Sequence, residues 1–281
     1  MINEVIKLRE PDAKGFVPTL TTYVLEDPME NCSVRQRPAV LVCPGGGYGF
    51  CSRREAEPIA IMFNAAGFHA FILDYSVAPL HVYPEALSEV SDSLKLIRKN
   101  AEVWNVHPDK IAVCGFSAGG HLTASIGTLW NTEEAIKCED KSNKPNAIIL
   151  SYPVITSGEK AHRGSFDNLL GDRKDNPEML EFLSLENRVS KDTPPTFLWH
   201  TFSDNAVPVE NSLMFAKALK ENDVPFEMHI YPEGPHGLST ATKEVCIRQT
   251  ASKHVATWTS LVCEWLDSVF ETDYMVKDEY K

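Results

Sequence analysis

Three polar residues, far apart in the sequence, have types and surroundings that could perform nucleophilic chemistry. Ser117 lies in Gly115-Phe116-Ser117-Ala118-Gly119, directly after the apolar run 111–114. Asp204 follows the apolar stretch TFLWH, and His236 lies in the stretch YPEGPHG. A serine hydroxyl is a weak nucleophile that needs a base within hydrogen-bond reach and a carboxylate to orient that base. These residues are therefore a candidate nucleophile, acid and base.

The pentapeptide around Ser117 has the form G-x-S-x-G, which is typical of a nucleophile elbow between a strand and a helix. The flanking sequence fits, because 111–114 reads as a buried strand and 118–129 as a helix. We expect glycines in so tight a turn, since a side chain there would strike the neighbouring strand or helix. Taken alone, the pentapeptide is equally compatible with a strand–turn–helix that merely contains a serine.

The acid and the base are also ambiguous when each is taken alone. Asp204 could be an ordinary turn residue, and His236 an ordinary loop histidine. Glu233 and Asp172 are alternative acids with poorer placement. The chain order of nucleophile, acid and histidine nevertheless matches that of hydrolases with a nucleophile elbow. Together, the three positions predict a catalytic triad of Ser117, Asp204 and His236.

A second glycine-rich stretch could stabilise an oxyanion. Pro44-Gly45-Gly46-Gly47-Tyr48 follows the apolar run 37–43, and consecutive glycines let backbone amides face one point. We predict that Gly46, Gly47 and Ala118 form the oxyanion hole, with Gly45 as the close alternative. A phosphate cradle is the other possibility for a glycine run, but the G-K-[ST] and G-x-G-x-x-G patterns are missing.

Several further residues could contact a substrate. Tyr48, Tyr152 and Trp199 follow or end predicted strands and could stack on a substrate ring, although packing explains each of them equally well. A cluster of charged residues after the glycine run favours a solvated helix start: Arg53, Arg54, Glu55 and Glu57. One of these arginines, with Arg54 preferred, could instead orient a sugar hydroxyl.

The elements that must position these residues alternate between strand and helix from residue 38 onwards. Apolar runs predict buried strands at 37–43, 68–74, 111–114, 147–150, 196–200 and 226–230. Helical periodicity predicts helices at 57–66, from 84, at 118–129, from 208 and near the end of the chain, where Trp258, Trp265 and Leu266 share a face. This alternation indicates a mostly parallel sheet with helices on both faces, in which chemistry gathers at the carboxyl ends of strands.

Two segments depart from this pattern. Residues 19–25 have β-branched and aromatic character and predict a strand in an edge hairpin with the segment before it. Residues 154–194 are polar, with one expected short helix around 176–183. We interpret them as an insertion or lid over the site within a single domain, 1–281.

Composition narrows the possible partners and location. The 281 residues carry a formal net charge of −12, which argues against nucleic acid and anionic membranes as partners. No signal peptide or transmembrane run is evident, and the seven cysteines, Cys32 among them, are scattered without metal-ligand spacing. We therefore expect a cytoplasmic protein with reduced thiols and no metal.

These residues resemble the α/β-hydrolase esterases, and more narrowly the acetyl-esterase branch close to hormone-sensitive-lipase-type and feruloyl-esterase-like proteins, which includes acetyl xylan esterases. The similarity covers roughly residues 38–240, including CPGGGYGFCSRREAEPIA, FILDYSVAP, CGFSAGGHL, FLWHTFSDNAVPVENS and YPEGPHGLS. One departure is Pro44, where lipase-like relatives carry histidine before the glycines.

The resemblance implies an α/β-hydrolase fold and a serine carboxylesterase that acts without a cofactor through an acyl-enzyme. Short acyl groups, acetyl first among them, would leave a carbohydrate or small alcohol, so that the partner is a small-molecule ester such as an acetylated oligosaccharide. A feruloyl or aryl esterase and a formamidase-like amide hydrolase are alternatives within enzymes. A catalytically inactive hydrolase fold serving as a binding module is the alternative from a different class.

Overall fold

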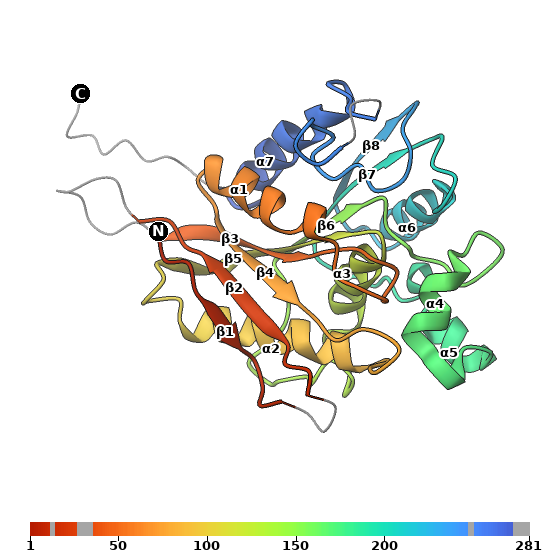
Figure 1. Cartoon of the computed structure of the whole chain (residues 1–281), viewed down its shortest axis with the longest axis horizontal. Helices are drawn as coiled ribbons and strands as arrows, with labels where there is room; N and C mark the ends of the chain where they lie inside the picture. The colour runs from red at the N-terminus through yellow and green to blue at the C-terminus, as the bar shows by residue number, and fades with distance from the viewer. Residues whose placement is uncertain (12–14, 27–35, 247–249, 272–281) are drawn as a thin grey trace.

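The computed structural model of the chain describes residues 1–11, 15–26, 36–246 and 250–271. Its centre is an eight-stranded sheet with the strand order β1-β2-β4-β3-β5-β6-β7-β8 (Figure 1). The strands are β1 (Val5–Lys7), β2 (Thr19–Tyr23), β3 (Arg37–Cys43), β4 (His69–Asp74), β5 (Val106–Phe116), β6 (Ala147–Ser151), β7 (Thr196–Thr201) and β8 (Phe226–Tyr231).

The sheet is parallel from β4 through β8 and antiparallel only at its β1–β2 edge. Val5 pairs with Thr21 in that edge, and Thr19 of β2 pairs with Asp74 of β4. The predicted edge pairing of the strand at 19–25 with the preceding segment is thus confirmed, as is the mostly parallel sheet.

Helices cover both faces of the sheet (Figure 1), with α1 and α7 on one face and α2, α3 and α6 on the other. The α-helices are α1 (Glu57–Ala65), α2 (Glu85–Lys99), α3 (Ala118–Leu129), α4 (Arg163–Leu170), α5 (Pro177–Phe182), α6 (Glu210–Glu221) and α7 (Trp258–Val269). The short 3-10 helices are η1 (Arg53–Glu55), η2 (Gly171–Arg173), η3 (Leu185–Asn187) and η4 (Val255–Thr257). Within the described residues, no helix is long and apolar enough to cross a bilayer.

Strand β3 shows why the apolar runs form central strands. Ala39, Leu41 and Cys43 pack into the core beneath α2 and α3. Val40 and Val42 point the opposite way, into the core beneath α1 and α7. Successive side chains of a strand face opposite sides, so a strand covered by helices on both sides needs apolar residues at every position. The continuous run RPAVLVC meets this requirement.

The structure differs from the sequence prediction mainly in two elements. Strand β5 extends over Val106–Phe116 rather than 111–114, because Val106 pairs with Arg37 across an irregularity in the register with β3. Helix α4 was not predicted. Its buried side chains include only three large apolar ones, Phe166, Leu169 and Leu170, in an otherwise polar segment. So few apolar positions give no readable helical period.

Residues 154–194 are attached to the main body by specific hydrogen bonds. The Asn168 Nδ2 group of α4 donates to the Gly47 carbonyl (2.8 Å), and the Tyr83 amide donates to the Leu169 carbonyl (2.7 Å). The expected short helix is present as α5, which lies next to α4 at one end of the molecule (Figure 1). This segment therefore contacts the glycine loop directly.

Candidate active site

Ser117 lies in a strained turn between β5 and α3, with φ 53° and ψ −117°. The glycines on both sides are required by the backbone around them. A Cβ on Gly115 would lie 2.0 Å from the Gly119 carbonyl oxygen, and a Cβ on Gly119 would lie 2.1 Å from that of Cys43. This geometry agrees with the elbow expected from the motif, and the positive φ of a non-glycine residue is the strain that presents the hydroxyl.

Three side chains that are distant in sequence meet in one hydrogen-bonded chain. His236 Nε2 lies 2.7 Å from Ser117 Oγ, and His236 Nδ1 lies 2.6 Å from Asp204 Oδ2. Ser117 follows β5, Asp204 follows β7, and His236 follows β8. The alternative acids Glu233 and Asp172 are both exposed to solvent, and the carboxylate bonded to the imidazole is that of Asp204.

The Asp204 carboxylate is surrounded by donors. Its Oδ1 accepts the amides of Ala206 (2.9 Å) and Val207 (3.0 Å), and its Oδ2 lies 3.3 Å from His200 Nε2 as well as against His236. Burial alone raises the pKa of Asp204. The hydrogen bonds from His200 and His236, the charge of His236 and the Val207 amide outweigh burial and hold this pKa well below its usual range. An ionised carboxylate is therefore maintained beside the imidazole.

The glycine loop lies against the serine. A Cβ on Gly45 would lie 3.1 Å from the Ser117 Cβ. The Gly45 amide is occupied, because it donates to Glu55 Oε2 at 2.9 Å. Within the described part of the chain, the amides of Gly46, Gly47 and Ala118 make no hydrogen bond to protein. Of the glycines considered from the sequence, Gly45 is thus the one whose donor is already used.

The expected substrate contacts of Tyr48 and Tyr152 do not match their environment. Tyr48 is buried, and its hydroxyl lies 2.9 Å from His121 Nδ1. Tyr152 is buried, its hydroxyl donates to Glu55 Oε1 (2.7 Å), and its ring lies edge-on to His236 with the centroids 5.0 Å apart. Both aromatic rings therefore pack beneath the site instead of lining it.

Trp199 and Arg54 have different positions. Trp199 is a core residue that stacks on Trp258 and donates its indole N–H to Ser151. Arg54 is exposed and donates to the Val245 carbonyl (3.2 Å), at the edge of a cavity of about 390 Å³ that His236 also lines. Of the four side chains expected to contact a substrate, Arg54 is thus the one that is exposed to solvent, and it lies next to His236.

Sequence reasoning missed three residues near the triad. Glu55 was read as part of a solvated face, but it is buried with 3% of its surface exposed, because the η1 turn directs it inward. His200 contacts Asp204, and its place at the end of a buried strand was a signal that it needs partners. His162, just before α4, is half-buried, and burial followed by the nearby charge of His236 lowers its pKa.

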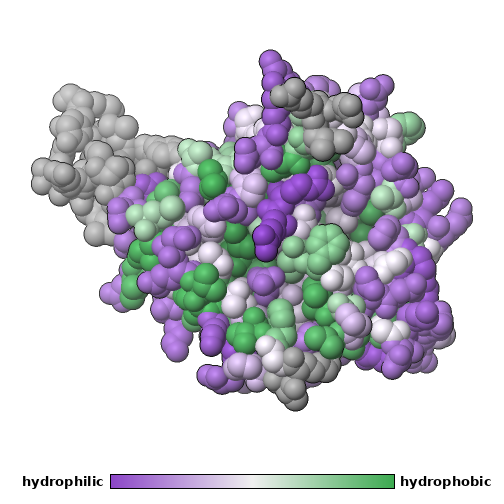
Figure 2. Space-filling view, viewed as in Figure 1, coloured by the Kyte–Doolittle hydropathy of each residue, from purple (hydrophilic) through white to green (hydrophobic). Residues whose placement is uncertain are grey.

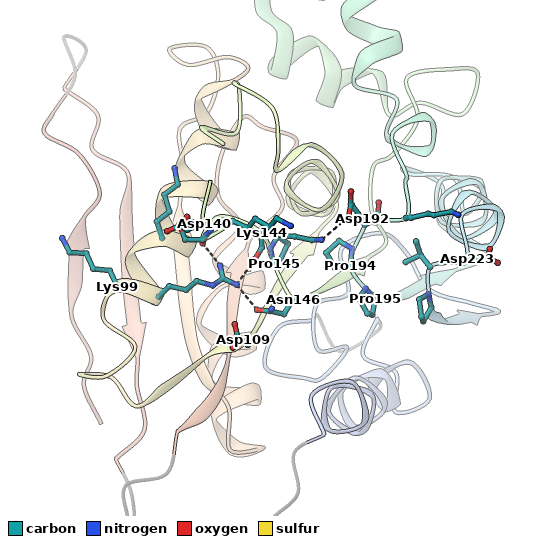
Figure 3. Close-up of a pocket in the computed structure, with 18 residues that line it drawn as sticks. Lys99, Asp109, Asp140, Lys144, Pro145, Asn146, Asp192, Pro194, Pro195 and Asp223 are labelled. Atoms are coloured by element: carbon teal, nitrogen blue, oxygen red, sulfur yellow. Dashed lines mark hydrogen bonds and ion pairs between the residues drawn. The ribbon is translucent and has the colours of Figure 1, made fainter. Parts of the chain in front are cut away.

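A cavity of about 960 Å³ lies away from this constellation, at the amino ends of β6, β7 and β8 (Figure 3). Its lining mixes lysines with aspartates, and the labelled Lys99 and Lys144 extend in different directions (Figure 3). The half-buried guanidinium of Arg98 donates to the Pro108, Ser142 and Lys144 carbonyls and to the Asn146 side chain. Arg98 therefore holds together the loops that contain Pro108 and residues 142–146. The charged side chains that line the cavity do not point toward one common ligand position (Figure 3).

Comparison with known proteins places this geometry in a family. A protein-family model described as BD-FAE matches residues 29–219, a span that includes Ser117 and Asp204. The chain belongs to the BD-FAE family of α/β-hydrolase esterases. The predicted α/β-hydrolase fold is thus confirmed, and the family to which the chain belongs is one of carboxylic ester hydrolases.

Individual relatives of this BD-FAE chain support the same family. It is 40% identical over 237 residues to endo-1,4-beta-xylanase B of Butyrivibrio fibrisolvens, covering 82% of this chain and 36% of that protein. It is 32% identical over 210 residues to an acetylxylan esterase of Xylanibacter ruminicola, covering 73% and 42%. The chain therefore spans less than half of the length of both relatives.

A solved structure covers nearly the whole chain. The acetyl ester-xyloside bifunctional hydrolase of Caldicellulosiruptor lactoaceticus has 39% sequence identity and a TM-score of 0.82, and the alignment covers 95% of this chain and 96% of that one. The BD-FAE chain and this hydrolase consequently share their fold over the aligned 95% of this chain.

Proposed function

We propose that the protein is a serine carboxylesterase that removes short acyl groups, acetyl above all, from carbohydrate or small-alcohol esters. The observation that carries the proposal is the continuous hydrogen-bonded chain from Ser117 Oγ through the His236 imidazole to Asp204. A serine held against an imidazole that is itself oriented by a buried carboxylate is activated for acyl transfer.

The mechanism assigns each group a role. Ser117 Oγ attacks the ester carbonyl while His236 Nε2 takes its proton, and the tetrahedral intermediate forms. The proton then passes to the departing alcohol, the carbon–oxygen bond breaks, and an acyl-enzyme remains. Water attacks this acyl-enzyme with His236 again as base, which releases the acid and restores Ser117. Asp204 holds the imidazole in the tautomer that keeps Nε2 as the acceptor.

The oxyanion hole is proposed to consist of the amides of Gly46, Gly47 and Ala118. Gly45 lies against Ser117 but has its own amide engaged by Glu55. The amides of the next two glycines and of the residue after the nucleophile remain available, as acyl transfer by an elbow serine requires.

Residues 154–194 are proposed to form one wall over this site. Helix α4 donates from Asn168 to the Gly47 carbonyl, and a Cβ on Gly47 would lie 3.8 Å from Ser165 Oγ. Burial and, after it, the charge of His236 lower the pKa of His162 at the start of the same helix. The segment thus borders the glycine loop, and its His162 lies within electrostatic reach of His236.

The proposed acyl and alcohol groups rest on relatives, one of them named an acetylxylan esterase and another an acetyl ester-xyloside hydrolase. The test is hydrolysis of p-nitrophenyl acetate, butyrate and octanoate beside acetylated xylo-oligosaccharide and methyl ferulate, with wild type and Ser117→Ala in parallel. Loss of activity in the variant and release of acetate from the sugar are expected. Turnover of methyl ferulate without sugar deacetylation would indicate an aryl esterase, and full activity of Ser117→Ala would disprove the mechanism.

A further inference from the structure

Glu55 is a buried carboxylate with no place in the triad. It ends the short helix η1, and its side chain is 3% exposed, whereas Arg54 and Glu57 around it are exposed. Among the described residues, no Lys, Arg or His nitrogen forms an ion pair with Glu55. Burying an anion without a counter-ion is costly unless its oxygens are hydrogen-bonded.

The two oxygens of Glu55 reach two different loops. Oε2 accepts the Gly45 amide of the glycine loop at 2.9 Å. Oε1 accepts the Tyr152 hydroxyl at 2.7 Å, and the same hydroxyl accepts the amide of Ser239 at 2.9 Å. Ser239 lies three residues after His236. A single carboxylate therefore connects the glycine loop to the histidine loop.

Both loops are shaped around this carboxylate. A Cβ on Gly45 would lie 2.6 Å from Glu55 Oε2 and 2.8 Å from the Phe116 carbonyl oxygen, and because that backbone oxygen cannot easily move, this place next to the carboxylate requires glycine. On the histidine side, a Cβ on Gly237 would lie 4.0 Å from Glu55 Oε1, and the ring of Tyr152 packs edge-on against His236. The proton acceptor and the glycine amides are thus positioned against the same group.

We propose that Glu55 is a positioning residue that sets the glycine amides and the His236 imidazole relative to Ser117; this inference rests on the proposed esterase function. By holding the Gly45 amide, Glu55 directs the Gly46 and Gly47 amides to the oxyanion. Its loss leaves the substrate-binding surface in place and displaces the groups that act in the transition state. The effect of its loss therefore falls on kcat, with KM nearly unchanged.

The test compares Glu55→Gln and Glu55→Ala with Tyr152→Phe and with the matched exposed control Glu57→Gln. A carboxylate accepts at both oxygens, whereas glutamine accepts at only one. Since losing one oxyanion-hole donor lowers kcat by about 10²- to 10³-fold, Glu55→Ala is expected to lose about 10²-fold. Glu55→Gln is expected to lose about tenfold, because it keeps one of the two contacts.

Tyr152→Phe isolates the histidine side of the link, since the bond between Glu55 and Gly45 remains. It is expected to lower kcat by less than Glu55→Ala, again without a change of KM. Glu57→Gln is expected to match wild type. The melting temperature of each variant identifies those that are simply unfolded, and the isosteric Glu55→Gln keeps the test valid should Glu55→Ala not fold.

The rate at which a fluorophosphonate labels Ser117 gives a second readout that is independent of the natural ester. Slower labelling of folded Glu55→Gln by about the same factor as its kcat supports the inference. A folded Glu55→Gln with wild-type kcat and labelling overturns it, and so does a loss confined to KM. If the wild-type protein is neither labelled nor active on any ester, the result contradicts the proposed esterase function itself and not only the role of Glu55.

Discussion

The role of Asp204 is best tested by exchanging one oxygen for an amide. In Asp204→Asn, the oxygen and the NH₂ group must be distributed between two environments. The Ala206 and Val207 amides donate to Oδ1, at 2.9 and 3.0 Å, and therefore require an acceptor there. The NH₂ group then faces the Nδ1 atom of His236, which lies 2.6 Å from Oδ2 in the wild type.

The opposite orientation of the asparagine is unfavourable. It would place the NH₂ group against the two backbone donors, at about 1–3 kcal/mol for each buried donor left without an acceptor. In Asp204→Asn the side-chain NH₂ group therefore donates to His236 Nδ1. Because Nδ1 must then be the acceptor, the neutral imidazole carries its proton on Nε2. An Nε2 that carries a proton cannot accept the one from Ser117, and the expected loss in kcat is about 10⁴-fold, or about 5.5 kcal/mol in the barrier.

The assay is kcat on p-nitrophenyl acetate for Asp204→Asn, with melting temperature as the measure of folding. Asp172→Asn and Glu233→Gln are matched controls, because both were alternative acids and both side chains are exposed. Each control is expected to retain wild-type kcat. A folded Asp204→Asn with more than a tenth of the wild-type kcat would refute the assignment of Asp204 as the orienting acid.

Three further predictions concern pH, backbone space and substrate contact. Burial lowers the pKa of His121 to about 4, so the unfolded state binds more protons below the usual 6.5. The free energy of unfolding should therefore fall as the pH drops from 6.5 to 4, by at most about 3 kcal/mol from this residue. Urea denaturation at several pH values should show a weaker dependence of this free energy on pH for His121→Gln than for the wild type. An equal dependence in the two proteins would contradict this. Gly119→Ala should fail to fold, with its Cβ 2.1 Å from a backbone oxygen, whereas Gly164→Ala, with 3.7 Å to its nearest neighbour, should keep the wild-type melting temperature. Phe50 is 62% exposed beside Gly46, where its ring could contact the sugar of a bound substrate. Phe50→Ala should therefore raise KM for acetylated xylo-oligosaccharide about threefold to tenfold, as an aromatic contact of about 1 kcal/mol implies, and should leave the kinetics with ethyl acetate unchanged. An unchanged KM for the sugar ester would exclude this contact.

The sheet and the meeting of Ser117, Asp204 and His236 at one of its ends could be predicted from sequence because local patterns determine them. Apolar runs such as 37–43 must be buried on both faces, and the residues that follow parallel strands gather at one end of the sheet. Figure 2 shows the complementary pattern on one face of the surface, where polar side chains predominate and apolar ones occur in smaller groups.

One expectation falls outside the described residues. Cys32 lies there, so its expected reduced thiol stays a prediction.

The roles of Glu55, Tyr48 and Tyr152 could not be predicted because their partners are remote in sequence. Tyr48 bonds to a histidine 73 residues away, and Tyr152 to a glutamate 97 residues away. Nothing in the local sequence distinguishes the buried Glu55 from the exposed Glu57. Such hydrogen bonds depend on how loops meet above the sheet, which no local periodicity encodes.

Ser117 and His236, its proposed proton acceptor, are 119 residues apart in the chain, and this separation links the proposed activity to the order of folding. The two residues meet only when β8 has paired with β7, and β7 through β6 with β5. Parallel pairings of distant segments form slowly, because loop closure precedes the contacts that stabilise them. During refolding, helical circular dichroism should therefore recover before hydrolysis, and the return of ester turnover should time the docking of the last strand.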